Sequence, residues 1–265
     1  MKNTQIISVI NQKGGVGKTT TVINLATALS LYKKKILVID LDPQGNATTG
    51  FGLSNNNSKT IYDVLNGSSS FEDSINDTKI DNLKIVPSNV DLSGLEVETA
   101  SENRRAFLLK DKIENFINSS KNDFSYIFID CPPSLSLLTV MSLVVAKSLI
   151  VPLQAEFFAL EGLSQLMKTI DRVKIKLNPE LEIRGVLLTM FDKRNKLSSQ
   201  VDTEARKFFK EKVYQTVIPR NVRLSEAPSH GVPILIYDKL CTGSKAYSSF
   251  SEEFLKQENL MESAA

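Results

Sequence analysis

The sequence predicts an α/β fold in which a mostly parallel β-sheet is flanked by helices on both faces. Apolar runs of strand length alternate with segments of helical periodicity along the chain, which is the order of elements in a parallel sheet covered by helices. Several of the runs are apolar throughout and rich in Ile and Val, as strands buried on both faces should be. The chain has 265 residues and no internal repeat, so we expect residues 1–265 to form a single domain.

Six strands are expected at the apolar runs, namely Gln5–Asn11, Ile36–Asp40, Leu83–Pro87, Tyr126–Asp130, Ser148–Leu153 and Ile183–Met190. Six helices are expected where apolar residues recur at helical spacing, at about Lys18–Leu31, Glu102–Phe116, Leu135–Ala146, Ala159–Leu177, Leu197–Phe209 and Ser244–Lys256. Two cysteines give no disulfide framework, and no apolar run reaches the roughly 20 residues of a membrane-spanning helix. We therefore expect a cytoplasmic protein.

A glycine-rich loop joins the first strand to the first helix, and it consists of Lys13, Gly14, Gly15, Val16, Gly17, Lys18, Thr19 and Thr20. In this position backbone N–H groups and the helix N-terminus point at an anion. We expect Lys18 to reach the β- and γ-phosphates of a nucleotide and the Thr19 hydroxyl to ligate Mg²⁺. The loop thus predicts a P-loop NTPase domain that hydrolyses ATP with Mg²⁺.

The loop departs from the strict Walker A pattern in two places. Gln12 stands where that pattern begins with glycine, and Lys13 is an additional lysine. Lys13 is either a solvated loop residue or a group that points outward to the nucleotide of another subunit. Its position in the sequence leaves both interpretations open.

Carboxylates follow two of the predicted strands. Asp40 and Asp42 come at the end of Ile36–Asp40 and just beyond it, and Asp130 ends Tyr126–Asp130. The carboxyl ends of parallel strands line the crevice where ligands bind. We expect Asp130 to contact Mg²⁺ through water, with Asp40 as a further candidate for the metal shell. Asp42, on a loop, is the candidate catalytic residue that orients the attacking water.

These features together resemble the ParA/Soj branch of the deviant Walker A ATPases, which act in chromosome and plasmid partitioning. The matching stretches are NQKGGVGKTTT (residues 11–21), DLDPQGN (40–46), DCPPS (130–134), VPLQAE (151–156) and IPRNVRLSEAPS (218–229). They span most of the chain in the expected order, and the last is the most specific to this branch.

The resemblance implies how the nucleotide would be used. ATP would drive a homodimer with two nucleotides at its interface, and Lys13 would act with Lys18 in catalysis by contacting the phosphates of the opposite subunit. Asp42 would be the catalytic aspartate. The base would be bordered by Met190, Pro219 and Asn221.

The resemblance also implies a partner for a basic segment of the chain. Residues 192–223 carry nine Lys or Arg against four acidic residues, on a chain with a net charge of +2. The ATP dimer would bind double-stranded DNA without sequence preference, at the nucleoid, through Arg194 and Arg223 with Lys193 as a helper. A ParB-like centromere-binding protein would stimulate hydrolysis. The alternative for Arg223 is a local salt bridge to Glu226.

Three other functions share some of these features. A membrane-surface ATPase like MinD has the same loop but needs a basic amphipathic C-terminal helix; here residues 250–265 carry four Glu and one Lys, so no membrane partner is expected. A reductase like the nitrogenase iron protein needs paired cysteines, and Cys131 and Cys241 lack suitable spacing. A non-enzymatic DNA-binding module would bind DNA without ATP.

Overall fold

The computed structural model describes residues 4–53, 58–119, 123–156 and 159–264, the side chains of 159–161 and 259–264 excepted. Seven strands form one sheet in the order β3-β4-β2-β5-β1-β6-β7. Every pairing is parallel except that of β3 with β4. The strands are β1 Gln5–Val9, β2 Ile36–Asp40, β3 Asn76–Asp77, β4 Leu83–Val86, β5 Tyr126–Asp130, β6 Ser148–Gln154 and β7 Glu182–Thr189.

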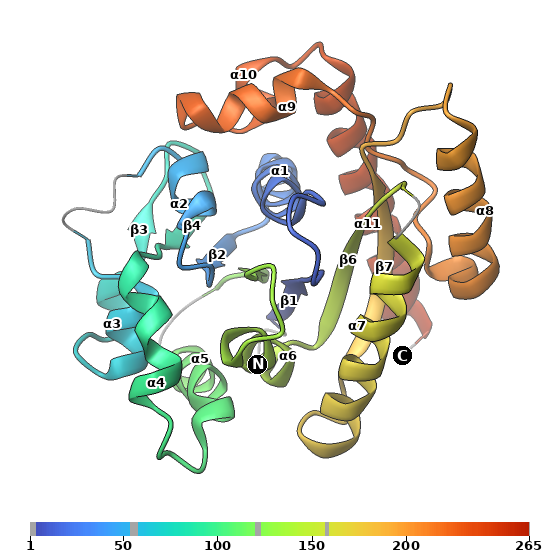
Figure 1. Cartoon of the computed structure of the whole chain (residues 1–265). Coiled ribbons are helices and arrows are strands. Elements are labelled where there is room, and N and C mark those ends of the chain that lie inside the picture. Colours follow the sequence, from blue (N-terminus) through green and yellow to red (C-terminus); the bar gives the residue numbers. More distant parts are fainter. Residues whose placement is uncertain (1–3, 54–57, 120–122, 157–158, 265) are drawn as a thin grey trace.

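Helices cover both faces of this sheet (Figure 1). They are α1 Lys18–Leu31, α2 Asn46–Gly50, α3 Ile61–Asn66, α4 Leu95–Glu98, α5 Leu108–Ser119, α6 Leu137–Val145, α7 Ala159–Lys176, α8 Lys196–Phe209, α9 Val222–Glu226, α10 Ile234–Tyr237 and α11 Thr242–Ala264. Single 3-10 turns are η1 Glu72–Ser74, η2 Val90–Gly94, η3 Arg105–Phe107, η4 Lys210–Lys212 and η5 Ala227–His230. No helix within the described ranges is long and apolar enough to cross a membrane. The predicted α/β class, with its mostly parallel sheet, is confirmed.

The hydrophobic core is built around the central strands, as their apolar composition predicts. Every residue of β2 and of β5 is buried. Helices α1 and α11 pack on one face of the sheet, and α11 contributes the fully buried Phe250 and Phe254. A second cluster joins the other face to α3, α5 and α6, and a third joins β6 and β7 to α7 and α8. The burial of apolar side chains in these three clusters is the main stabilising contribution to such a fold.

The helix predicted from Glu102 to Phe116 is displaced along the sequence. The α-helix begins only at Leu108, after the 3-10 turn Arg105–Phe107, and runs to Ser119. The residues before this turn are exposed, so they have no apolar side chains to bury and gain little from a helical turn. The last helix also runs on to Ala264, beyond the predicted end at Lys256. The other predicted ends agree with the structure or differ by one or two residues.

Two glycines hold the loop after α2 against the loop after η5. Gly52 and Gly231 have φ angles of +77° and +63°, a region that favours glycine. A Cβ added at Gly52 would lie 2.8 Å from the carbonyl oxygen of Gly231, and one added at Gly231 would lie 2.7 Å from Cα of Gly52. The two backbones are therefore in direct contact.

Replacing Gly52 with alanine is expected to destabilise the protein more than the same change at Gly67. Gly67 also has a positive φ of +83°, but a Cβ there meets no atom within 4 Å. Both variants carry a conformational strain of about 1–2 kcal/mol, and Gly52→Ala adds about 1–3 kcal/mol of steric overlap. Urea denaturation of the two variants measures the difference, and equal losses would contradict the contact.

Candidate functional site

The glycine-rich loop has the backbone geometry of a phosphate cradle. Gly15 has a φ of +74°, and Gly17, which caps α1, has a φ of +89°. Both angles lie in the left-handed region, which side chains with a Cβ rarely adopt. Because Gly17 turns the chain directly into α1, the first N–H groups of this helix face the loop, where an anion is favoured.

Neighbouring strands fix the loop at both of its ends. The side-chain amide of Asn11 donates to the Pro152 carbonyl in β6 (2.7 Å), and its oxygen accepts from the Lys13 N–H (3.0 Å). The Thr189 hydroxyl at the end of β7 donates to the Val16 carbonyl (2.8 Å). These bonds explain why β1 ends at Val9 rather than at the predicted Asn11, whose side chain belongs to the loop.

The two lysines of the loop have different environments. Lys18 is buried, with 6% of its surface exposed, and its ammonium donates to the Lys13 carbonyl (3.2 Å). Burial lowers the pKa of Lys18, although the nearby Asp130 carboxyl opposes the shift. The side chain of Lys13 is 44% exposed and forms an ion pair with Glu156. Lys18 thus lies inside the site and Lys13 at its rim.

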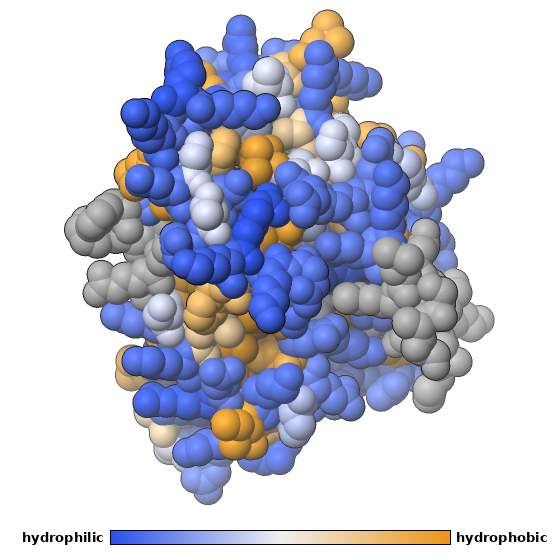
Figure 2. Space-filling model, turned by 90° about the vertical axis from the view of Figure 1, so that its right-hand side faces the viewer, coloured by the Kyte–Doolittle hydropathy of each residue, from blue (hydrophilic) through white to orange (hydrophobic). Residues whose placement is uncertain are grey.

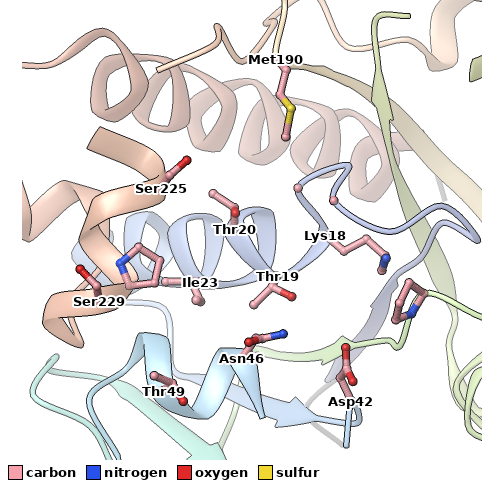
Figure 3. Close-up of a pocket in the computed structure, with 14 residues that line it drawn as sticks. Lys18, Thr19, Thr20, Ile23, Asp42, Asn46, Thr49, Met190, Ser225 and Ser229 are labelled. Carbon is pink, nitrogen blue, oxygen red and sulfur yellow. The ribbon is translucent and has the colours of Figure 1, made fainter. Parts of the chain in front are cut away.

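A cavity of about 490 Å³ opens above the loop (Figure 3). Lys18, Thr19 and Asp42 line one end, with Asn46 and Thr49 from α2 to the left of Asp42 in the picture. The full lining is Gly15, Gly17, Lys18, Thr19, Thr20, Ile23, Asp42, Asn46, Thr49, Pro133, Met190, Ser225, Pro228 and Ser229. Its volume falls in the range of roughly 300–1,000 Å³ for small-molecule sites.

The carboxylates at the strand ends take different positions. Asp40 and Asp130 are direct partners in the register of β2 and β5, and both are fully buried. Asp40 accepts bonds from the Asp42 N–H (3.2 Å) and from the N–H and hydroxyl of Thr48 (2.8 and 2.7 Å). Burial raises the pKa of Asp40 to about 6, although the Thr48 bonds lower it. These bonds engage Asp40 in holding α2, and a place for it in the metal shell stays a prediction.

Asp130 has the environment expected of a group that awaits a cation. Neither of its carboxylate oxygens accepts a well-formed hydrogen bond from the described residues, although the Thr19 hydroxyl lies near enough to interact with them. Burial, and next the Asp40 carboxyl, raise the pKa of Asp130 well above its usual range, whereas the Thr19 hydroxyl lowers it. A buried carboxylate that lacks well-formed hydrogen bonds is costly. Together with the Thr19 hydroxyl in the cavity, it fits a hydrated Mg²⁺.

Asp42 lies at the wall of the cavity, beside the phosphate loop. Its side chain accepts from the Gln44 N–H (3.0 Å), and its carbonyl accepts from Gly45 (2.9 Å). Asp42 is 6% exposed and reaches the cavity from the loop between β2 and α2 (Figure 3). The structure thus brings Asp42 together with Lys18 and Thr19.

The opposite end of the cavity differs in part from the base site implied by the resemblance. Met190 lines it, with a φ of +50° that is unusual for a side chain with a Cβ. Pro219 and Asn221 are not among the lining residues of the described chain. Pro219 bridges to Phe191, and the Asn221 side chain caps α9 by accepting from the Arg223 N–H (2.8 Å). Three residues that the sequence did not single out line this end of the cavity, namely Ser225, Pro228 and Ser229.

The residues expected to contact DNA lie on two connected segments. Arg194 and the exposed Lys193 follow β7, and Arg223 lies on α9. The Phe191 carbonyl accepts from the Arg220 N–H (3.3 Å), which joins the two segments. The Arg194 side chain is 91% exposed and pairs with Asp192 (3.0 Å). Figure 2 shows the side of the molecule where α8 lies, largely covered by hydrophilic residues.

Arg223 forms the local salt bridge that the sequence left open. Its guanidinium contacts Glu226 at 2.8 Å and Asp238 at 3.9 Å, and half of its side chain remains exposed. An exposed pair of this kind is weak and is screened by salt. Arg223 therefore remains free to exchange these acids for another anion.

Comparisons with known proteins agree on one family. Residues 4–183 match the family model described as an AAA domain. The chain is 50% identical to the chromosome partitioning protein ParA of Caulobacter vibrioides, over 96% of this chain and 95% of that protein. It is 47% identical to the sporulation initiation inhibitor protein Soj of Bacillus subtilis, over 94% and 97% of the two chains. A cobyrinic acid a,c-diamide synthase from Mycobacterium smegmatis, solved with an ATP analogue and magnesium, is 32% identical with a TM-score of 0.84, over 96% and 94% of the chains. The chain belongs to the ParA/Soj family of chromosome-partitioning ATPases.

Proposed function

We propose that this partitioning ATPase uses ATP and Mg²⁺ to form a homodimer that binds DNA without sequence preference and leaves it after hydrolysis. The observation that carries this proposal is the division between its two loop lysines. Lys18 lies inside the cavity, whereas Lys13 lies at its exposed rim. A lysine at this position can contact the phosphates bound by a second subunit, because Lys18 would already contact the phosphates in its own cavity. The whole chain would act as one unit.

Each group of the site has a place in phosphoryl transfer. The loop backbone, from Gly14 to Thr20, would hold the phosphates, and Lys18 would neutralise charge on the β- and γ-phosphates. Thr19 would ligate Mg²⁺, and Asp130 would hold it through water. Asp42 would orient the attacking water, while Met190, Ser225 and Pro228 border the far end, where the base would lie. Bound Mg²⁺ supplies the electrostatic stabilisation of the transferring phosphoryl group.

The proposal is tested by sedimenting DNA with native and Asp42→Ala protein in the presence of ATP, ADP or no nucleotide. We expect both proteins to bind DNA only with ATP. The variant should retain DNA for longer, because ATP that is not hydrolysed leaves the dimer intact. DNA binding that is the same with ATP, with ADP and without nucleotide would instead indicate a non-enzymatic DNA-binding module. A native rate of ATP turnover in Asp42→Ala would remove the catalytic role of Asp42.

Replacing both Arg194 and Arg223 with glutamate is expected to abolish DNA retention while ATP binding is kept. Each arginine that contacts a phosphate contributes to affinity through counterion release, so single alanine variants should each lower the salt dependence by about one ion. A gel shift over a series of salt concentrations measures both effects. Arg172→Glu, an exposed change on α7, is the matched control, and equal DNA binding in all variants would refute the assignment.

A ParB-like centromere-binding partner is the expected stimulator of hydrolysis, and an assay of ATP turnover with and without such a protein and DNA tests it.

A membrane-surface role like that of MinD is less well supported. The described part of α11 buries Phe250 and Phe254 in the core, and Glu252 and Glu253 contact Tyr32 and the backbone of residues 215–216. This helix is therefore engaged with the rest of the protein and carries an acidic surface, which anionic lipids would repel.

A further inference from the structure

The backbone of Lys13 is fixed by hydrogen bonds, whereas its side chain is held only by an exposed ion pair. Its N–H donates to Asn11 (3.0 Å) and its carbonyl accepts from Lys18 (3.2 Å). The peptide groups on both sides are thus held by residues of the phosphate loop itself. The side chain, 44% exposed, is the part that can change partners.

The present partner of that side chain is Glu156, 34% exposed, which follows β6. The same strand supplies the Pro152 carbonyl that anchors Asn11 (2.7 Å). The end of β6 therefore holds Lys13 twice, once through Asn11 and once through Glu156. Glu156 ends the stretch VPLQAE, in which the Pro152 carbonyl anchors the loop but the glutamate has no assigned role in phosphoryl transfer.

We propose that Glu156 is a positioning residue that keeps the Lys13 ammonium within its own subunit and is exchanged for a nucleotide phosphate of the partner subunit when the dimer forms. This inference rests on the proposed ATP-dependent dimer. A triphosphate carries more negative charge than a single carboxylate, so it is the stronger partner of the ammonium once the two subunits meet. Glu156 then raises the concentration at which ATP drives dimerisation.

The expected size of the effect follows from the exposure of the pair. Exposed pairs are weak, which makes this one easy to break. Two of them are lost for each dimer formed, one in each subunit. Removing the charge of Glu156 should therefore raise the association constant of the dimer by roughly two- to thirtyfold.

The first experiment measures dimerisation by analytical ultracentrifugation over a range of protein concentrations, with a non-hydrolysable ATP analogue. Glu156→Gln should dimerise at lower concentration than the native protein, and Glu156→Asp, which keeps the charge, should stay near native. Glu180→Gln, an exposed change beyond α7, is the control. Dimerisation of Glu156→Gln that is unchanged or weaker than native would overturn the inference.

A double variant separates this role from a general effect on structure. If Glu156 acts through Lys13, then Glu156→Gln should change nothing in a Lys13→Gln background. The residual dimerisation of Lys13→Gln can be followed at high protein concentration. An equal gain from Glu156→Gln with and without Lys13 would contradict the exchange.

A second measurement does not depend on the dimer. Acylation of Lys13 by an amine-reactive ester, followed by peptide mass spectrometry, reports how far its ammonium is held in the nucleotide-free protein. Lys13 should react several-fold faster in Glu156→Gln than in the native chain, while Lys168 should react equally in both. If native protein fails to dimerise with ATP, the proposed function fails. If Lys13 reactivity is also unchanged, the ion pair itself is refuted.

Discussion

Replacing Lys18 with methionine is expected to weaken ATP binding by at least about a hundredfold, because a charge-assisted hydrogen bond contributes about 1.5–3 kcal/mol and Lys18 would reach two phosphates. The same change should not destabilise the nucleotide-free protein. Burial lowers the pKa of Lys18, so at neutral pH holding its charge costs the folded state stability, and an apolar side chain of similar length removes that penalty.

Titration with a fluorescent ATP analogue and thermal unfolding without nucleotide measure the two effects separately. Lys168→Met, at an exposed position on α7, is the control and should change neither. A large loss of thermal stability in Lys18→Met would mean that the variant weakens binding by unfolding the loop. Native affinity for ATP would remove Lys18 from the phosphate site.

Replacing Asp130 with asparagine should lower ATP turnover by roughly a hundredfold or more, the effect of losing one electrostatic group worth about 3 kcal/mol in the transition state. Its effect on the nucleotide-free protein depends on pH. The folded-state pKa of Asp130 is raised, so its contribution to stability is present below the unfolded pKa and is lost as pH rises through the folded pKa. Native stability should therefore decline as the pH rises from about 4, where an aspartate in an unfolded chain titrates.

The variant should show a shallower decline with pH, although Asp40, whose pKa is raised to about 6, keeps part of it. Urea denaturation at a series of pH values, without nucleotide or Mg²⁺, gives the comparison. Adding Mg²⁺ and ATP should flatten the native curve, because the cation stabilises the ionised Asp130. Identical pH profiles for the two proteins would show that the pKa of Asp130 is not raised in the folded protein.

The parts of the fold that sequence alone predicted are those encoded by neighbouring residues. The apolar runs indicated the strands of the sheet core, and the glycines indicated the loop, because positive φ angles at Gly15 and Gly17 are a local property. Short elements were missed, since α2 and α9 have five residues each and are too short for a helical period to be visible. For α3, the capping box of Thr60 and Asp63 was an available signal.

The features of the site that the sequence did not predict arise from contacts between distant residues. Asp40 could be placed at a strand end, but its bonds to Thr48 could not be foreseen. The base site implied by the resemblance included Pro219 and Asn221, whereas the place of Ser225 in the cavity wall was not predicted. The pairing of Lys13 with Glu156 joins two stretches that no local pattern relates. In each case tertiary packing selected the partner.

The contact between Gly52 and Gly231 limits how the cavity can change shape. Thr49 and Ser229, from the elements just before these glycines, line the same cavity. Because the two backbones touch without an intervening side chain, no rotamer change can absorb a displacement between them. The contact therefore limits how closely these two walls can approach each other. A ligand that spans them is spared the entropy of ordering the walls, so tight binding requires few new contacts there.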